Sequence, residues 1–431
     1  METSMTRSGY LISVSSENSD SSEAVPDAVT SLISKGFYAT LFSEKWNSSI
    51  PSTLGDYLTM KAGDNVYFMC KRIIYGIGEI VQMFPGDAIA SFELQDGATT
   101  TKYHPDSCLT TTAKAQGNET KTKVMRWGII FKASPYFFKT GVDMDDMLAS
   151  NPSAFRSLRT FWKKSFIQFD EVENSAFRSA IIRNNQSVLL RAEASDAFIP
   201  CGEPDGKSIL PRCSPQQIQL NALLSSKRTS KGEVRDEMLV ECALIEALER
   251  GTDSAETVFG HWDYISHQVA ASPFKPIDYM DRIDVFGYRW IPGYEHQIIS
   301  KYLVVEIKKG VSDNRNSSSV RDYEQLMKYV DWVCREYAHG DYSMIEAYLL
   351  AYDFKPDLAT CSANSNQISL ATSRSYVAGH KSKTHYWNDI TFVKYEVDPS
   401  GLISFERVAS QNRANWTNGS SESPQFALEV Q

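Results

Sequence analysis

The chain has 431 residues, of which 42% are hydrophobic and 23% charged, a composition typical of folded globular proteins and unlike that of disordered or fibrous ones. With a formal net charge of −9, the chain as a whole does not attract nucleic acid, so any such contact would depend on local basic patches. The seven scattered cysteines include no CxxC pair, and no apolar run approaches the roughly 18 residues that span a bilayer. These features argue against a disulfide framework, a zinc site, a secretory signal and a membrane role, and they favour the cytoplasm.

The first half of the chain is expected to form a β-rich domain over residues 31–190. Gly, Pro, Asp and Asn signals divide it into short segments of strand-like composition. These segments are 36–43, 64–72, 74–84, 90–95 and 124–134. A helix is expected over 145–164, broken once at Pro152. The Ser- and acid-rich N-terminus, residues 1–30, is expected to be disordered, as is the similar tail, residues 410–431.

A linker is expected at residues 191–228, because its central part holds three prolines and two glycines without clear periodicity. The region that follows, residues 229–409, is expected to be a second domain. Its predicted elements are a helix at 234–250, strands at 282–288 and 302–310, a helix at 320–337 and a strand at 345–354. This mixed order assigns the chain to the α/β class.

Three residues on two of these strands form a group with a chemical use. Strand alternation places Glu306 and Lys308 on one face, and it separates Asp284 from its apolar neighbours Ile283 and Val285. Two carboxylates can hold Mg²⁺ through hard oxygen ligands, and the ion then polarises a phosphate and lowers the pKa of a bound water. A lysine beside them can orient or deprotonate that water, or counter the charge that grows on the phosphate. The alternative interpretation is a solvated Glu–Lys pair of little energetic value.

The order of the surrounding elements makes the pattern more specific. Over residues 230–355 the chain resembles the PD-(D/E)XK nuclease superfamily, with Asp284 in IDV and with Glu306 and Lys308 in EIK. The resemblance implies a restriction-endonuclease-like mixed sheet flanked by helices. It also implies a Mg²⁺ site, with Mn²⁺ as a substitute, at Asp284, Glu306 and the Ile307 carbonyl. The chain departs from the literal motif because no proline precedes Asp284.

The family pattern also implies functional groups on helices. A helix-borne glutamate serves as an auxiliary metal ligand, for which Glu241 is the preferred candidate and Glu237 and Glu246 are rivals. Gln325 matches the glutamine that lies near the site, in the helix after the E-x-K strand. Tyr329 lies four residues later on the same face, but it also belongs to an apolar stripe, which favours a packing role.

Two histidines, His261 and His267, precede the Asp284 strand. Their spacing of six suits neither one helix face nor a tight ligand pair on a strand. We therefore expect core or surface histidines here, rather than a metal pair or a general base.

In the first half, residues 58–81 (LTMKAGDNVYFMCKRIIYGIGEIV) resemble the EVE-like branch of the PUA-like β-barrel superfamily. The resemblance implies a barrel that holds a modified base or flipped nucleotide in an aromatic pocket, where stacking contributes roughly 1–3 kcal/mol per base. The candidates for this pocket are Trp46, Trp127 and Phe138. Their alternative role is in the core, where buried aromatic side chains usually belong.

Together, the two resemblances imply a Mg²⁺-dependent DNA endonuclease of the restriction or phage-defence kind, acting on DNA with modified bases. Two alternatives stay open: a non-catalytic nucleic-acid-binding protein and an RNA-directed nuclease. Cutting both strands of a duplex would need two active sites, which suggests a homodimer, although many relatives nick or trim as monomers. The sequence holds no GxxxxGK[ST] motif, so an ATPase, where one is needed, would be a separate partner.

Overall fold

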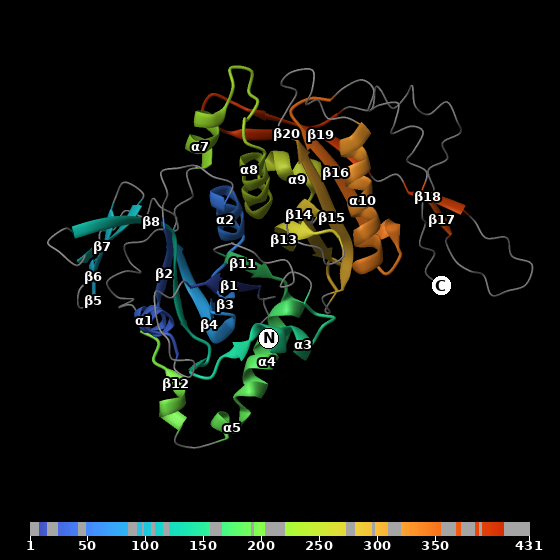
Figure 1. Cartoon of the computed structure of the whole chain (residues 1–431). Coiled ribbons are helices and arrows are strands. Elements are labelled where there is room, and N and C mark those ends of the chain that lie inside the picture. The colour runs from blue at the N-terminus through green and yellow to red at the C-terminus, as the bar shows by residue number, and fades with distance from the viewer. Residues whose placement is uncertain are drawn as a thin grey trace, which may run out of the picture. The chain divides into compact units, whose positions relative to one another are not determined.

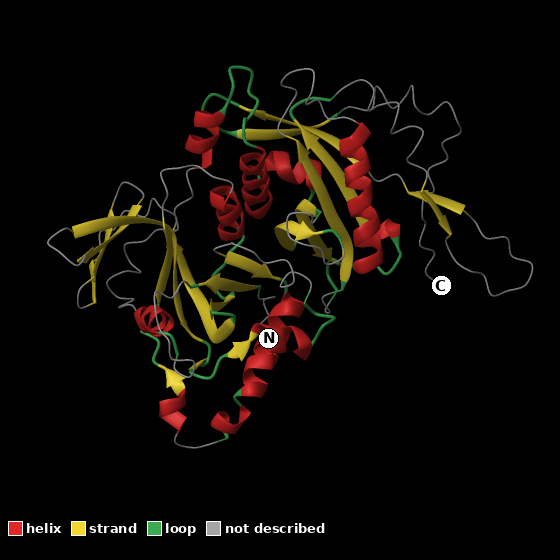
Figure 2. Ribbon diagram, viewed as in Figure 1, coloured by secondary structure: helices red, strands yellow, loops and turns green. Residues whose placement is uncertain are grey.

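The structure, a computed structural model, forms two compact units (Figure 1). Unit 1 comprises Met1–Leu223, Glu241–Arg250 and Tyr264–Arg282, and unit 2 comprises Leu224–Val240, Gly251–Asp263 and Ile283–Gln431. The residues that the structure describes are 8–14, 25–41, 49–84, 93–96, 99–104, 108–114, 120–155, 166–190, 194–202, 220–272, 281–294, 298–308, 320–354, 368–371, 384–387 and 390–408. Mixed sheets with flanking helices confirm the α/β class (Figure 2).

A large sheet dominates unit 1, with strand order β11-β1-β3-β4-β8-β7-β6-β5; β10 also pairs with β4, and β2 with β8. The pair β1–β3 is parallel, and the other pairs are antiparallel. The strands are β1 (Gly9–Ser13), β2 (Phe37–Leu41), β3 (Asn65–Cys70), β4 (Ile73–Phe84), β5 (Glu93–Asp96), β6 (Thr99–His104), β7 (Cys108–Lys114), β8 (Thr120–Ala133), β10 (Val142–Asp143) and β11 (Phe166–Phe169). A separate short pair joins β9 (Phe137–Phe138) to β12 (Phe198–Ile199).

The N-terminal segment that was expected to be disordered contains β1. Tyr10, Leu11 and Ile12 are fully buried there, because β1 lies between β3 and β11 in the sheet. The Ser-rich composition of residues 13–28 hides this short apolar run before it. The expected tail, residues 410–431, lies outside the described residues.

The sequence analysis predicted only one of the following helices of unit 1, α3. They are α1 (Asp27–Lys35), α2 (Ser49–Leu58), α3 (Met144–Ser150), α4 (Glu171–Asn184), α5 (Gln186–Leu189) and the 3₁₀ turn η2 (Ala194–Ala197). α3 ends before Pro152, as expected. α4 begins at an N-cap, where the Asp170 carboxylate accepts the Glu173 N–H at 2.8 Å. In the core of unit 1, the centroid of its Phe177 ring lies 4.9 Å from that of the Tyr67 ring.

Three buried ionisable side chains meet in unit 1, from α2, from α8 (Glu237–Arg250) and from β13 (Tyr264–Ala270). His267 Nδ1 lies 2.6 Å from Glu241 Oε1, and His267 Nε2 lies 3.1 Å from Asp56 Oδ1. Each of the three residues is at most 3% exposed. The Gln268 amide donates to the other Glu241 oxygen at 2.9 Å. His267 is thus a core histidine, as expected, and it bridges two carboxylates.

Gly55 of α2 lies directly against the His267 ring. A Cβ built on Gly55 would come 2.5 Å from His267 Cε1, and carboxylates on both ring nitrogens prevent the ring from moving away. We expect Gly55→Ala to lower the free energy of unfolding by about 1–3 kcal/mol, because overpacking outweighs the better helix propensity of alanine. Urea denaturation would measure the change, and an unchanged or higher midpoint would contradict the tight contact.

Unit 2 contains a mixed sheet in which strands β14, β15, β16, β19 and β20 are successive neighbours. They span β14 (Arg282–Trp290), β15 (Ile299–Lys308), β16 (Ile345–Ala351), β19 (Ile390–Val397) and β20 (Ile403–Arg407). β15–β16 and β16–β19 are parallel, while β14–β15 and β19–β20 are antiparallel. β17 (Ile368–Ala371) pairs with β18 (Thr384–Trp387).

The longest helix of unit 2, α10 (Val320–Glu336), packs against β15 and β16 (Figure 1). Its apolar stripe is buried as predicted: Leu326, Tyr329, Val330 and Val333 are at most 2% exposed. The remaining elements are α7 (Leu220–Lys227), which begins in unit 1, α9 (Asp253–Phe259), which packs against β20, and the 3₁₀ turn η4 (Tyr342–Met344). Among the described residues, no helix is both long and apolar enough to cross a membrane.

Candidate active site

Asp284 lies where the pairing of β14 with β15 ends. The antiparallel register joins Val285 to Val305, and its continuation by one residue places Asp284 opposite Glu306. The Asp284 Oδ2 atom accepts the Ile307 N–H at 2.7 Å. This bond holds the Asp284 carboxylate against the backbone of β15, while Ile283 and Val285 are fully buried. The predicted separation of Asp284 from its apolar neighbours is confirmed.

Glu306 is the most deeply buried acid of this group, at 1% exposure. The Lys308 ammonium donates to its Oε1 atom, so the predicted shared face of Glu306 and Lys308 is also confirmed. Its Oε2 atom is buried and has no hydrogen-bond partner among the described residues. Burial raises the pKa of Glu306 to about 7, although the charge of Lys308 acts to lower it. A buried carboxylate oxygen without a partner costs free energy, so this position needs an electrostatic explanation.

Lys308 is the cation of the site. Burial acts to lower the pKa of its ammonium, but the charges of Glu306, Glu237 and Asp284 together raise that pKa above its ordinary value. Lys308 therefore stays protonated at neutral pH, surrounded by carboxylates. Asp322, in the first turn of α10, and Glu237 also raise the pKa of Glu306, so their charges reach the site.

The helix glutamates differ in what they contact. Glu237, the first residue of α8, belongs to unit 2, and its charge acts on both Glu306 and Lys308. Glu241, the preferred candidate from the sequence, belongs to unit 1 and accepts from His267 and Gln268. Glu246 pairs with Arg250 at 2.7 Å. Of these three glutamates, Glu237 is the one whose charge acts on the candidate site.

Gln325 and Tyr329 lie on one face of α10, as their spacing predicts. The Gln325 amide donates to the Tyr329 hydroxyl at 2.7 Å, and Tyr329 is 2% exposed. Tyr329 therefore packs in the interior and fixes the amide of Gln325, while Gln325 itself is partly exposed.

The aromatic candidates of unit 1 lie in its interior. Trp127 is 7% exposed, forms the extra residue of a bulge in β8 and stacks on Tyr57 with ring centroids 6.3 Å apart. Phe138 is 1% exposed and packs beside Phe198 at 5.6 Å. A base could reach either ring only if neighbouring side chains moved. Trp46 lies outside the described residues.

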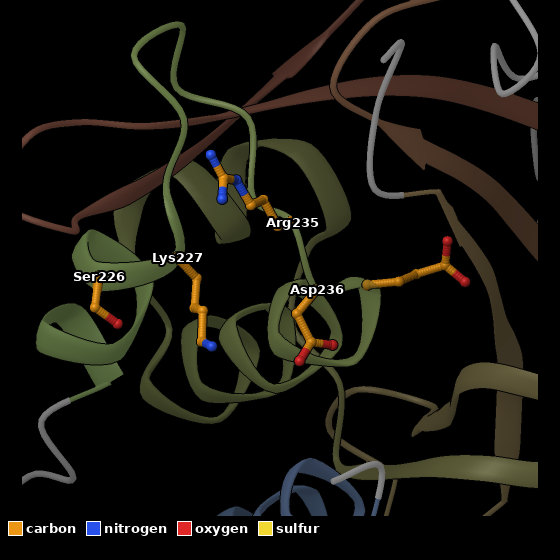
Figure 3. A pocket seen from close by; sticks show the side chains of 5 residues that line it. Ser226, Lys227, Arg235 and Asp236 are labelled. Atoms are coloured by element: carbon orange, nitrogen blue, oxygen red, sulfur yellow. The ribbon is translucent and has the colours of Figure 1, made fainter. Parts of the chain in front are cut away.

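A polar cavity of about 490 Å³ lies in unit 2 (Figure 3). It is lined by Ser226, Lys227, Arg235, Asp236 and Glu237. Sequence reasoning did not find the first four of these residues, because a Lys and an Arg eight positions apart resemble an ordinary solvated surface. The only available signal was the acidic start of α8.

The donor set at the site suits Mg²⁺ or Mn²⁺ better than Zn²⁺. Within the described residues, no three His, Cys, Asp or Glu side chains form a ready ligand group. The buried Oε2 of Glu306 without a partner, together with the Asp284 carboxylate, offers hard oxygen donors of the kind that Mg²⁺ and Mn²⁺ prefer. These residues therefore fit such an ion.

Comparison of the chain with protein-family models, curated proteins and solved structures finds no significant match.

The raised pKa of Glu306 predicts a pH dependence of stability in the presence of EDTA. Between the ordinary glutamate value of about 4.3 and the folded value of about 7, the native state binds more protons than the unfolded state. This residue's contribution to the free energy of unfolding therefore falls as pH rises through that window, by about 1–3 kcal/mol. Denaturation of the wild type and Glu306→Gln should show that the variant becomes more stable relative to the wild type as pH rises through that window. A pH-independent difference would contradict the shift.

Proposed function

We propose that this protein is a metal-dependent nuclease that hydrolyses phosphodiester bonds in DNA, with a PD-(D/E)XK-type site at Asp284, Glu306 and Lys308. The observation that carries the proposal is the state of Glu306. It is buried with one unpartnered oxygen, beside a fixed aspartate and a charged lysine, at the end of a central strand. A solvated Glu–Lys pair would show neither the burial nor the orphaned oxygen.

In this proposal, Asp284 and Glu306 hold Mg²⁺, or Mn²⁺ in its place, with the Ile307 carbonyl and Glu237 as further oxygen ligands. When bound, the ion polarises the phosphate and lowers the pKa of a water molecule. Lys308 keeps its positive charge at neutral pH, so it can orient the attacking water and offset negative charge on the phosphate. Gln325, whose amide is held by its hydrogen bond to Tyr329, takes the role of the glutamine that lies near the site in the family. Glu237 takes the role that the resemblance implied for Glu241, because Glu241 is held by His267 and Gln268.

We assign unit 1 the role of a PUA-like reader of modified bases, on the resemblance of residues 58–81. The combination describes a restriction or phage-defence nuclease that tests the DNA before cutting it. Trp127 is buried, so base recognition through it would require a local rearrangement on binding.

The test is a cleavage assay with the full chain. Plain DNA, phage DNA with modified bases, and RNA would each be incubated with Mg²⁺, with Mn²⁺ and with EDTA. We expect metal-dependent cutting of DNA that is faster on the modified substrate.

Each outcome separates one alternative. Preferential cutting of RNA would replace DNA as the substrate. Binding of DNA without hydrolysis in either metal would replace the enzyme by a non-catalytic binding protein. Equal cutting of plain and modified DNA would remove the base-reading role from unit 1 and leave the nuclease.

A further inference from the structure

We propose that the cavity of unit 2 binds backbone phosphates of the substrate strand near the phosphodiester that is cut, with Lys227 and Arg235 as the phosphate-binding side chains. This inference rests on the proposed nuclease function. It adds two binding residues, outside the Asp284, Glu306 and Lys308 group, that decide where the strand lies.

The composition of the cavity wall supports a phosphate ligand. Its five side chains are two carboxylates, Asp236 and Glu237, and three hydrogen-bond donors, the cations Lys227 and Arg235 and the hydroxyl of Ser226. These three groups donate hydrogen bonds to phosphate oxygens, and the hydrogen bonds from the cations are charge-assisted. Figure 3 shows the ammonium of Lys227 and the guanidinium of Arg235 reaching in different directions from neighbouring backbone segments. They can therefore contact different oxygens of a strand.

The backbone that carries these two cations is anchored. The Arg235 N–H donates to the Lys227 carbonyl at 3.2 Å, which ties the two segments together. Between them, the Arg228 guanidinium donates to the Val397 carbonyl at 2.5 Å, and the Tyr352 hydroxyl donates to the Lys231 carbonyl at 2.5 Å. The cavity wall is thus attached to β19 and to the end of β16. A binding wall on such support is positioned before the ligand arrives.

The cavity also connects to the candidate site through Glu237. Glu237 lines the cavity, and its charge raises the pKa values of both Glu306 and Lys308. The cavity lining therefore offers cations for a phosphate together with a carboxylate whose charge acts on Glu306 and Lys308. A phosphodiester strand beside a divalent ion needs both, since carboxylates alone would repel it.

Because the chain carries a net negative charge, DNA binding would require cations at a particular place on its surface. The chain carries 53 acidic and 44 basic residues, so long-range attraction opposes DNA binding. Affinity must then come from cations that contact phosphates directly. Lys227 and Arg235 are cations placed on the same cavity as a carboxylate of the candidate site.

The experiment compares Lys227→Gln/Arg235→Gln with the matched control Lys328→Gln/Arg335→Gln, whose two cations are exposed on α10. Both variants lose two positive charges. Binding of a labelled DNA duplex and of a single strand would be measured by anisotropy in EDTA, between about 50 and 200 mM salt. We expect the cavity variant to bind roughly tenfold more weakly for each lost cation. The slope of log affinity against log salt should fall by about 1 per lost contact, and the control should match the wild type.

Two further measurements keep the result interpretable. Lys227→Arg/Arg235→Lys preserves both charges and should restore binding, and thermal unfolding of each variant shows whether it folds. In Mg²⁺, the cavity variant should raise KM with little change in kcat, since uniform binding is lost.

The outcomes distinguish this inference from the function on which it rests. Cleavage by the wild type with equal affinity and KM in cavity and control variants would overturn the cavity and leave the nuclease. A cavity-specific loss of binding without any cleavage would support the phosphate site and overturn the hydrolysis. No DNA binding by the wild type in EDTA would overturn the phosphate site.

Discussion

Under the proposed function, Glu306→Gln is expected to reduce the rate of DNA cleavage by about 10³-fold, the largest effect on activity that we predict. The amide keeps the size of the side chain but removes its negative charge. About 4 kcal/mol of charge stabilisation is then lost from the transition state, and each 1.4 kcal/mol corresponds to a tenfold change in rate. The measurement is a single-turnover rate with saturating DNA and Mg²⁺.

The matched control is Glu406→Gln, which removes an exposed carboxylate from β20 in the same unit. It should leave the rate within twofold of the wild type. Burial disfavours the charged form of Glu306, and the charges of Glu237 and Asp284 still act on Lys308 when Glu306 is neutral, so the loss of rate should come without loss of stability, which thermal unfolding checks. Equal rates for both variants would remove Glu306 from the reaction and with it the central part of the proposed function.

His267→Leu is expected to lower the free energy of unfolding by about 3–5 kcal/mol, the largest single effect on stability that we predict. The ring fills the space between Asp56 and Glu241, at 3.1 and 2.6 Å, and all three residues are buried. Leucine would fill part of that space but would leave two carboxylates uncompensated and facing each other. The larger part of the loss should come from Asp56, since its Oδ2 already has no hydrogen-bond partner among the described residues.

His261→Leu provides the control for that substitution. The His261 side chain is 74% exposed and lies 3.6 Å from Asp263, so its loss should change stability by no more than about 0.5 kcal/mol. Urea denaturation at neutral pH would measure both variants. A loss below about 1 kcal/mol for His267→Leu would mean that the two carboxylates find other partners or water.

The elements that carry Asp284, Glu306 and Lys308 could be predicted from the sequence because their patterns are local. Alternation in β14 and β15 separates buried apolar residues from the three polar ones. In α10, the stripe from Leu326 to Val333 follows helical spacing over about two turns. Each pattern is decided by residues within one element, so it needs no knowledge of the rest of the fold.

The features that the sequence did not predict depend mostly on contacts between residues far apart in the chain. The choice of Glu237 over Glu241 as the further metal ligand depends on His267, which lies in β13 and hydrogen-bonds the Glu241 carboxylate. The parallel pairing of β1 with β3 joins Tyr10 to Val66, and no local signal specifies such a partner. α4 is different, because the capping pair Asp170 and Glu173 was a readable start signal.

Helix α8 belongs to both units, which limits how the two halves of the chain can recombine during evolution. Its first four residues, Glu237–Val240, belong to unit 2, and its remainder, Glu241–Arg250, belongs to unit 1. A recombination that joined the first half of this chain to another protein at residues 191–228 would separate Asp56 from His267 and Glu241. The inherited pieces would each keep part of a charged core. We therefore expect the two halves of the chain to be inherited together, because Asp56 and its partners Glu241 and His267 come from both halves.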